Sequence, residues 1–153
     1  MQESAEVPNG NTQDFLTIMI ADQRFGIPVL QVQDVLREQK VTKIPLAPDE
    51  VAGSLNLRGR IVTAINVRKR LNLPPNEGES HSSMSVVVEH NHELFSLVID
   101  RVGDVLSLDR SLFEKNPGTL DQEWRDISNG IYQLQEELLI VMDVPKLLED
   151  VGK

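Results

Sequence analysis

The histidines have the clearest potential for chemistry, because an imidazole can bind a metal or transfer a proton near neutral pH. His90 and His92 span an expected turn, and Glu89 and Glu93 flank them. A metal site there would need a further ligand, and the spacing of the sequence places none nearby. The remaining histidine, His81, lies in a polar segment and is expected in solvent. We therefore predict that no metal is bound.

Other catalytic patterns are missing from the sequence. It has no cysteine, no Gly-x-Ser-x-Gly nucleophile motif, no Walker loop and no Gly-x-Gly-x-x-Gly motif. The acids near apolar segments show no paired arrangement in an apolar cleft, and we interpret them as surface groups: Asp100, Asp104, Glu136, Glu137 and Asp143. We predict a protein that is not an enzyme, has no catalytic residue and no cofactor, and works through its surfaces. A small metal-dependent hydrolase that uses His90 and His92 is the enzymatic alternative.

A cluster of basic residues contrasts with the charge of the whole chain. The chain has a formal net charge of −9, yet residues 56–71 hold five of its 15 Lys and Arg residues. Arg58-Gly59 is expected at a hairpin turn, since glycine supplies the backbone freedom that a tight turn needs. One interpretation is a hairpin with a solvated basic end. The other is that Arg58 occupies an exposed corner, where its rigid donor fork suits an acidic partner.

Composition limits both the fold and the partners. Hydrophobic residues make up 40% of the 153 residues and aromatic residues only 4%, so the core must be built mainly from Val, Leu and Ile, which favours strands. The pI near 4.8 argues against a nucleic-acid partner, which requires a cationic surface. No segment approaches the ~20 apolar residues of a membrane-inserted helix. The polar start of the chain carries no secretory signal.

Local patterns predict short strands with few helices. Residues 15–21 alternate in a way typical of a strand, which is expected to pair back with residues 24–27. Pro28 is expected to begin a helix that ends near Leu36. Further strands are expected at residues 41–44, 54–57, 61–67, 84–89, 94–99, 102–108, 130–134 and 138–142. A helical turn is expected at 68–71 and a last helix at 145–149, capped by Asp143.

The two halves of the chain resemble each other. A shift of 70 residues places Phe25 on Phe95 and Asp34 on Asp104, and a shift of 77 places Gly53 on Gly130. We infer a mostly β fold of two small five-stranded barrel lobes, because closure removes exposed sheet edges. The expected organisation is a flexible tail at 1–14, lobe 1 at 15–73, a linker at 74–83 and lobe 2 at 84–150. Whether the lobes exchange strands is left open.

Several motifs together resemble the CheW family of bacterial chemotaxis coupling proteins. They include Phe25-Gly26-Ile27, residues 41–45, Gly53, Asn56-Leu57-Arg58-Gly59 and residues 144–148. The resemblance covers nearly the whole chain. It implies two five-stranded barrels with a further apolar core between them, in a cytoplasmic adaptor associated with membrane-bound receptor arrays. The family commonly has Pro where Thr63 stands and Asp where Asn66 stands, and we expect the fold to tolerate both differences.

The resemblance also implies two partners, the cytoplasmic tip of a chemoreceptor and the regulatory domain of the histidine kinase CheA. The receptor tip is a helical hairpin that would dock between the lobes. The implied receptor-binding residues are Val32, Asp34, Arg58, Gly59, Val102 and Val105, with Asp34 and Arg58 paired near the surface. The implied kinase-binding residues are Val35, Val41 and Ile44. A regulatory adaptor of a related chemosensory pathway is the alternative within the same class.

Overall fold

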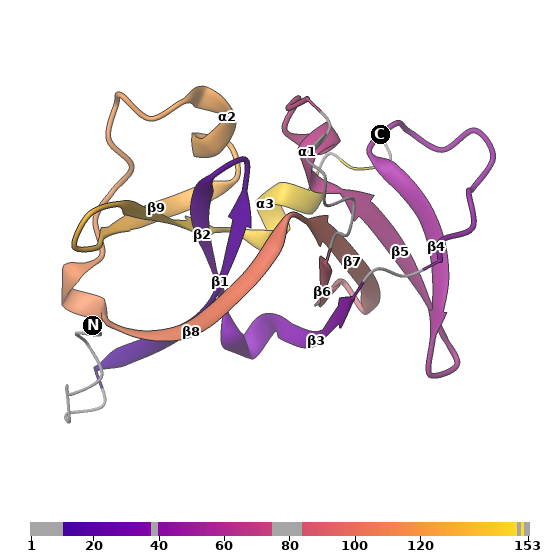
Figure 1. Ribbon diagram of the computed structural model, residues 1–153, viewed down its shortest axis with the longest axis horizontal. Coiled ribbons are helices and arrows are strands. Elements are labelled where there is room, and N and C mark those ends of the chain that lie inside the picture. The colour runs from indigo at the N-terminus through magenta and orange to yellow at the C-terminus, as the bar shows by residue number, and fades with distance from the viewer. Residues whose placement is uncertain (1–10, 38–39, 75–83, 150, 152–153) are drawn as a thin grey trace.

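The computed structural model describes residues 11–37, 40–74, 84–149 and 151. Within these residues the strands form two five-stranded sheets, which lie side by side with a short helix between them (Figure 1). Sheet A has the strand order β8-β1-β2-β10-β9, and sheet B has the order β3-β6-β7-β5-β4. The prediction of a mostly β protein with two five-stranded units is confirmed.

The bounds of the elements follow the chain. Sheet A consists of β1 (Thr12–Ile20), β2 (Gln23–Pro28), β8 (Arg101–Asp109), β9 (Ser128–Gln133) and β10 (Leu138–Met142). Sheet B consists of β3 (Val32–Arg37), β4 (Val51–Leu57), β5 (Arg60–Asn66), β6 (Met84–His90) and β7 (Glu93–Ile99). The helices are η2 (Val29–Gln31), α1 (Val67–Arg70), η3 (Arg110–Leu112), α2 (Gln122–Arg125) and α3 (Val144–Glu149).

The buried apolar side chains form three clusters, of which one joins the two sheets. The central cluster takes residues from both sheets, such as Ile18 of β1 and Val86 of β6. A second cluster, which contains Phe15, belongs to sheet A alone, and a third, which contains Val87, belongs to sheet B alone. Successive side chains of a strand point to opposite faces, so β1 and β6 each supply two clusters. This burial on both faces explains why apolar residues occupy successive positions in parts of both strands, at residues 15–16 of β1 and 86–88 of β6.

Each sheet combines strands from both halves of the chain. β1 and β2 pair with β8, β9 and β10, whereas β6 and β7 pair with β3, β4 and β5. The lobes therefore exchange strands, and the expected boundary at 74–83 does not separate the sheets; its residues 75–83 lie outside the described part of the chain. The strand orders of the two sheets correspond when β8 is matched with β3, β1 with β6, β2 with β7, β10 with β5 and β9 with β4.

A short bridge brings the two ends of each sheet together. In sheet B, Thr42 exchanges two backbone hydrogen bonds of 2.8 Å with Ser54 of β4, and in sheet A Glu114 pairs in the same way with Ile131 of β9. The chain crosses directly over a glycine at both places: a Cβ on Gly53 would lie 2.3 Å from the Thr42 carbonyl oxygen. The sheets are thus strongly curved, but single bridges replace the continuous ladder of the expected closed barrels.

The predicted helix from Pro28 to Leu36 is wrong. Only Val29–Gln31 form a 3-10 turn, and Val32–Arg37 form β3, paired with β6. The spacing of the apolar residues fitted a helix, but the burial of β3 alternates with a period of two, and pairing with β6 selects that period. The expected strand at 41–44 reduces to the Thr42 bridge. β1 begins at Thr12, inside the expected tail, and residues 1–10 lie outside the described part.

An ion pair lies between the two sheets, where α1 follows β5 and where residue 100 connects β7 to β8. Arg68 of α1 donates from Nε to Asp100 Oδ1 at 2.9 Å and from Nη2 to Asp100 Oδ2 at 2.7 Å. The Ala21 N–H, in the turn between β1 and β2, donates to the same Oδ2 at 2.9 Å. Burial opposes ionisation of Asp100, but the Arg68 guanidinium and the Ala21 N–H outweigh it and lower the pKa of the carboxyl.

Candidate functional site

The corner that carries Arg58 is a two-residue hairpin turn between β4 and β5. Leu57 pairs with Arg60, and both turn residues adopt the left-handed backbone conformation, with φ of 53° at Arg58 and 85° at Gly59. Such turns match the twist of paired strands. The Asn56 side chain stabilises this one by accepting a 3.0 Å hydrogen bond from the Gly59 N–H. The motif Asn56-Leu57-Arg58-Gly59 therefore forms a stabilised turn that places Arg58 at an exposed corner.

Asp34 of β3 lies opposite this corner and pairs with it. Its Oδ2 lies 2.7 Å from Arg58 Nη1, and its Oδ1 accepts a 2.8 Å hydrogen bond from the Val35 N–H. The Arg58 side chain is 74% exposed and that of Asp34 is 23% exposed. The guanidinium and, to a lesser degree, the Val35 N–H lower the pKa of the Asp34 carboxyl below its ordinary value.

The ion pair connects the two outer strands of sheet B. β3 and β4 stand at opposite ends of the strand order, and the curvature of the sheet brings them together. The Arg58–Asp34 pair and the Thr42–Ser54 bridge both span this junction. A register shift between Val32 and Asp34 interrupts the pairing of β3 with β6. Bulges of this kind re-aim side chains, and here the bulge lies directly before the residue that meets Arg58.

The valines expected in the receptor surface differ in exposure. Val32 and Val102 are partly buried and pack against the central cluster. Val105, on the outer strand β8, is 55% exposed and lies opposite Leu16 of β1 in the strand pairing. Gly59 is exposed, and a Cβ there would meet no atom within 4 Å. The structure thus joins Asp34 to Arg58, packs Val32 and Val102 against the central cluster, and leaves Val105 exposed.

The residues expected to bind the kinase also separate into two kinds. Val41 is partly buried, packs against the cluster of sheet B and lies beside Gly53. Val35 and Ile44 are exposed large hydrophobic side chains. Ile44 lines a surface cavity of about 300 Å³ together with Lys43 and Lys69. Val41 is therefore part of the packing of sheet B, whereas Val35 and Ile44 are exposed.

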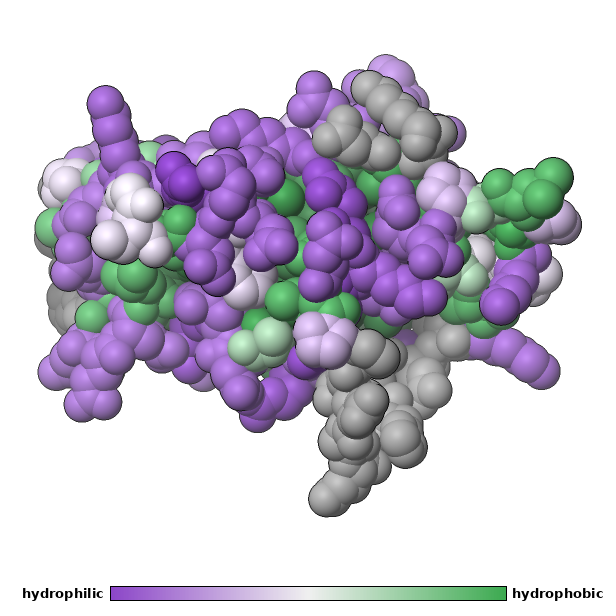
Figure 2. All heavy atoms as spheres, turned by 90° about the horizontal axis from the view of Figure 1, so that it is seen from above, coloured by the Kyte–Doolittle hydropathy of each residue, from purple (hydrophilic) through white to green (hydrophobic). Residues whose placement is uncertain are grey.

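The sequence argument missed several exposed hydrophobic residues, and Ile61 and Leu46 are two of them. Ile61 is 70% exposed and pairs with Asn56 beside the Arg58 turn, and Leu46 is fully exposed in the loop before β4. Figure 2 shows apolar surface at the end of the molecule that carries this loop. The alternation along β5 could have identified Ile61, because Val62 points inward and its neighbour must then point outward. Nothing in the pattern of the proline-rich loop distinguishes Leu46.

The basic cluster of residues 56–71 serves two purposes. Arg68 forms the ion pair with Asp100, and Arg70 donates from Nε to the Leu147 carbonyl of α3 at 2.8 Å. These two arginines hold parts of the molecule together. Arg60 and Lys69 are exposed, and Arg58 is exposed although paired with Asp34. The interpretation of a uniformly solvated basic end is therefore wrong for Arg68 and Arg70.

The described residues contain no group of three or more His, Cys, Asp or Glu side chains able to hold a metal ion. His90 lies 3.3 Å from the Asn91 side chain, and its ring is 6.5 Å from that of Phe95. Within the described part of the chain, none of the helices has the length and apolar character needed to cross a membrane.

The chain is similar to known proteins over most of its length. Residues 14–152 match the family model described as the CheW-like domain. The chain is 33% identical over 138 residues to the chemotaxis protein CheW of Klebsiella aerogenes, which covers 89% of this chain and 81% of the relative. It is 26% identical over 146 residues to the chemotaxis protein CheW of Bacillus subtilis, covering 95% of this chain and 92% of that one.

A solved structure agrees with the fold described above. The crystal structure of the scaffolding protein TtCheW from Thermoanaerobacter tengcongensis superposes with a TM-score of 0.81 and 27% sequence identity. The match covers 93% of this chain and 96% of the other. The similarity therefore includes both curved sheets rather than a single lobe.

Proposed function

This chain belongs to the CheW-like domain family, and on that premise we propose that it couples chemoreceptor tips to the histidine kinase CheA as a non-enzymatic scaffold. The relatives are named as chemotaxis proteins, and the structural neighbour is named as a scaffolding protein. The proposed location is the cytoplasm, at the membrane-bound receptor arrays. A scaffold works by holding partners in a fixed relation, and the shared central cluster is suited to that task because it holds the two sheets together.

The observation that carries the receptor part of the proposal is the exposed Arg58–Asp34 pair. An exposed ion pair contributes little to stability, so its value must lie elsewhere. The guanidinium has five N–H donors, and Nη1 makes the 2.7 Å contact with Asp34. Asp34 can therefore orient Arg58 while the remaining donors meet a carboxylate of the receptor hairpin. Exposed Ile61 beside the turn supplies apolar area for the same contact.

The receptor proposal is tested by co-sedimentation with a receptor signalling fragment, with and without CheA. Arg58→Glu is expected to weaken binding by roughly tenfold, because it replaces a cation with an anion beside Asp34. Arg60→Glu is the matched control, since Arg60 is also exposed and lies two residues away. Circular dichroism should show that both variants are folded. Undiminished assembly of the Arg58→Glu protein would contradict the proposal.

An exchange of the two charges separates the partner contact from the internal pair. The double variant Asp34→Arg, Arg58→Asp keeps opposite charges at the junction of β3 and β4 but places a carboxylate on the exposed corner. If Arg58 contacts the receptor, this variant stays as weak as Arg58→Glu. Recovery of binding would instead show that only the pairing of the strands matters.

For the kinase, we propose the exposed residues Val35 and Ile44, with Val41 beneath them, and we add Leu46. Apolar side chains at this end of the molecule (Figure 2) suit the dry centre of a protein interface. Ile44→Ser and Leu46→Ser are each expected to weaken binding to the CheA regulatory domain, measured by calorimetry. Leu112→Ser, a change at an exposed residue of η3 whose exposure of 62% lies between those of Ile44 and Leu46, should leave it unaltered. An equal loss in all three variants would argue against a specific surface.

A further inference from the structure

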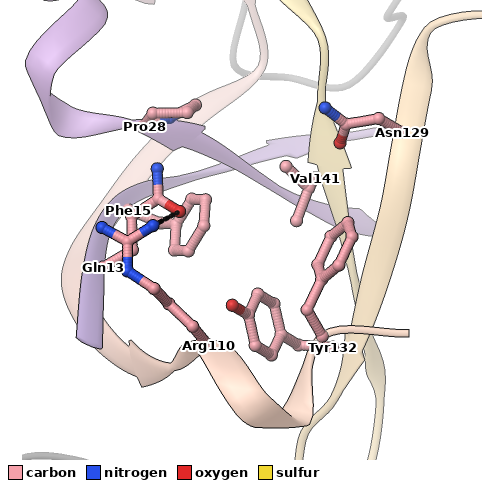
Figure 3. Close-up of a pocket in the computed structure, with 8 residues that line it drawn as sticks. Gln13, Phe15, Pro28, Arg110, Asn129, Tyr132 and Val141 are labelled. Atoms are coloured by element: carbon pink, nitrogen blue, oxygen red, sulfur yellow. Dashed lines mark hydrogen bonds between the residues drawn. The ribbon is translucent and has the colours of Figure 1, made fainter. Parts of the chain in front are cut away.

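A cavity of about 280 Å³ opens at one end of sheet A, and none of its lining residues is among those assigned to receptor or kinase (Figure 3). Its apolar lining comes from strands β1, β9 and β10 and from the residue that follows η3. Phe15, Tyr132 and Val141 are almost completely buried, and Phe113 is partly exposed at the rim. The Tyr132 ring packs edge-on against both Phe15 and Phe113, with ring centroids 5.6 Å apart in each case. Gln13, Pro28, Arg110 and Asn129 complete the lining.

Polar groups gather at the mouth of this cavity. Arg110 donates from Nη1 to Gln13 Oε1 across a long 3.4 Å contact, shown as a dashed line in Figure 3. The Tyr132 hydroxyl faces the open space between them (Figure 3). Burial raises the pKa of Tyr132, and the charge of Arg110 acts against that rise. The phenol is therefore protonated at neutral pH and can donate a hydrogen bond, beside a guanidinium with unused donors.

The architecture of the lobe does not require this cavity. The matched positions in sheet B, found by the shifts of 77 and 70 residues, carry Leu55 for Tyr132, Ala52 for Asn129 and Ser85 for Phe15. An aromatic floor with polar groups at its mouth is thus particular to sheet A. Small-molecule sites typically combine an apolar pocket with a few convergent polar groups.

We propose that this cavity binds a small monocarboxylate with one aromatic ring or a branched aliphatic body. The body would lie on Phe15 and Val141, and the carboxylate would accept hydrogen bonds from Arg110 and the Tyr132 hydroxyl. A dry cavity of about 150 Å³ is enough for benzene, so the space suits one ring and its acid group. Asp109, whose Oδ1 accepts from the Ser111 N–H and hydroxyl, adds negative charge near Tyr132. That charge disfavours a doubly charged group such as phosphate.

The test is titration of the full chain with phenylacetate, followed by two-dimensional amide NMR. Two related compounds serve as comparison ligands. Phenylacetamide lacks the negative charge of phenylacetate, and phenyl phosphate carries a second negative charge. Saturating shifts confined to β1, β9, β10 and η3 are expected with phenylacetate, and weaker binding with the other two. Arg110→Gln should weaken phenylacetate binding by about tenfold, the effect of losing a charge-assisted hydrogen bond. Arg101→Gln, another exposed arginine of sheet A, should have no effect.

Several outcomes would overturn the proposal. Equal binding of phenylacetamide would show that only apolar contact matters, and unchanged binding by Arg110→Gln would remove the carboxylate site. If phenylacetate does not bind and Arg110→Gln weakens association with the CheA fragment, the cavity receives a side chain of a partner protein instead. The NMR titration contains neither receptor nor kinase, so its result is independent of the proposed scaffold function.

Discussion

At the scale of single residues, Arg58 combines an unfavourable backbone with an exposed charge. Its φ of 53° places a side chain in the left-handed region, which costs roughly 1–2 kcal/mol for most residues. Asn and Gly are the usual residues at this position of a two-residue turn. The backbone conformation therefore does not account for an arginine at this position. Its side chain, which pairs with Asp34 and is exposed, accounts for it better.

A substitution by asparagine should therefore separate stability from function. Arg58→Asn is expected to raise the free energy of unfolding by up to about 1 kcal/mol, because asparagine tolerates the left-handed region. The same change should weaken receptor binding, since the exposed cation is lost. Urea unfolding and co-sedimentation measure the two effects. A variant that becomes less stable would show that the exposed ion pair outweighs the backbone strain.

The pH dependence of Asp34 offers a second test at this scale. Because its folded pKa lies below the unfolded value, the pair stabilises the fold above that unfolded value. The contribution is lost as the pH falls through the lowered folded pKa. Arg58→Gln is expected to raise the pKa of Asp34 toward its ordinary value, measured by carboxyl NMR titration. An unchanged pKa would mean that the Val35 N–H alone sets the shift.

At the scale of elements, the crossing of each connection over a glycine decides how the sheets curve. A Cβ at Gly53 would meet the Thr42 backbone and the Val41 side chain, and one at Gly130 would meet the Phe113 ring. The two glycines align under the same shift of 77 residues, and they occupy equivalent places in β4 and β9. The sequence predicted the equivalence, but only the fold explains it as a close approach.

This crossing can be tested with a pair of alanine variants. Gly53→Ala is expected to lower the free energy of unfolding by roughly 3 kcal/mol, because backbone atoms cannot move aside as a flexible side chain can. Gly59→Ala should lower it by only about 1 kcal/mol, since space is free and only the backbone conformation is disfavoured. Thermal unfolding provides the comparison. Equal losses would contradict the role assigned to the crossing.

At the scale of the whole molecule, the two sheets act as one unit. Strand exchange forces each half of the chain into both sheets, and the central cluster is built from both. The Arg68–Asp100 pair adds a polar link between α1, the β1–β2 turn and the start of β8. A rigid relation between the sheets is what a scaffold between two partners needs.

Removal of this link should weaken the fold as a whole. Asp100→Asn is expected to lower the free energy of unfolding by roughly 2 kcal/mol, because both side chains of the pair are mostly buried. Asp104→Asn, an exposed change on β8, should cost less than about 0.5 kcal/mol. Since the folded pKa of Asp100 is lowered, the difference between wild type and Asp100→Asn should shrink in acid. A constant difference would argue against the ion pair.

Strand exchange predicts how fragments behave. A fragment of residues 1–78 is expected to be unfolded alone, since β1 and β2 lack their partners in sheet A. The fragments 1–78 and 79–153 mixed together should regain β structure by circular dichroism and unfold in one transition. A folded N-terminal fragment would show that contiguous lobes are stable after all.

The predictable part of the fold came from local patterns. Strands β1 and β4 followed from apolar alternation, β5 followed from its β-branched residues, and the cap at Asp143 followed from residue type. β3 was not predictable, because its apolar spacing also fits a helix and its strand conformation depends on pairing with β6. Of the candidate site, the Arg58 corner was predictable from Asn56 and Gly59, whereas Leu46 was not.

The sequence by itself determined the strand-rich class, the duplication, the basic cluster and the resemblance to a family, because these are properties of residue type and order. Tertiary structure decided which sheet each strand joins, that Arg68 and Arg70 are internal links, and that β3 and β4 meet where Asp34 faces Arg58. The physical reason is that these features depend on contacts between segments distant in sequence. Such contacts are selected by burial in the shared core, which local spacing does not encode.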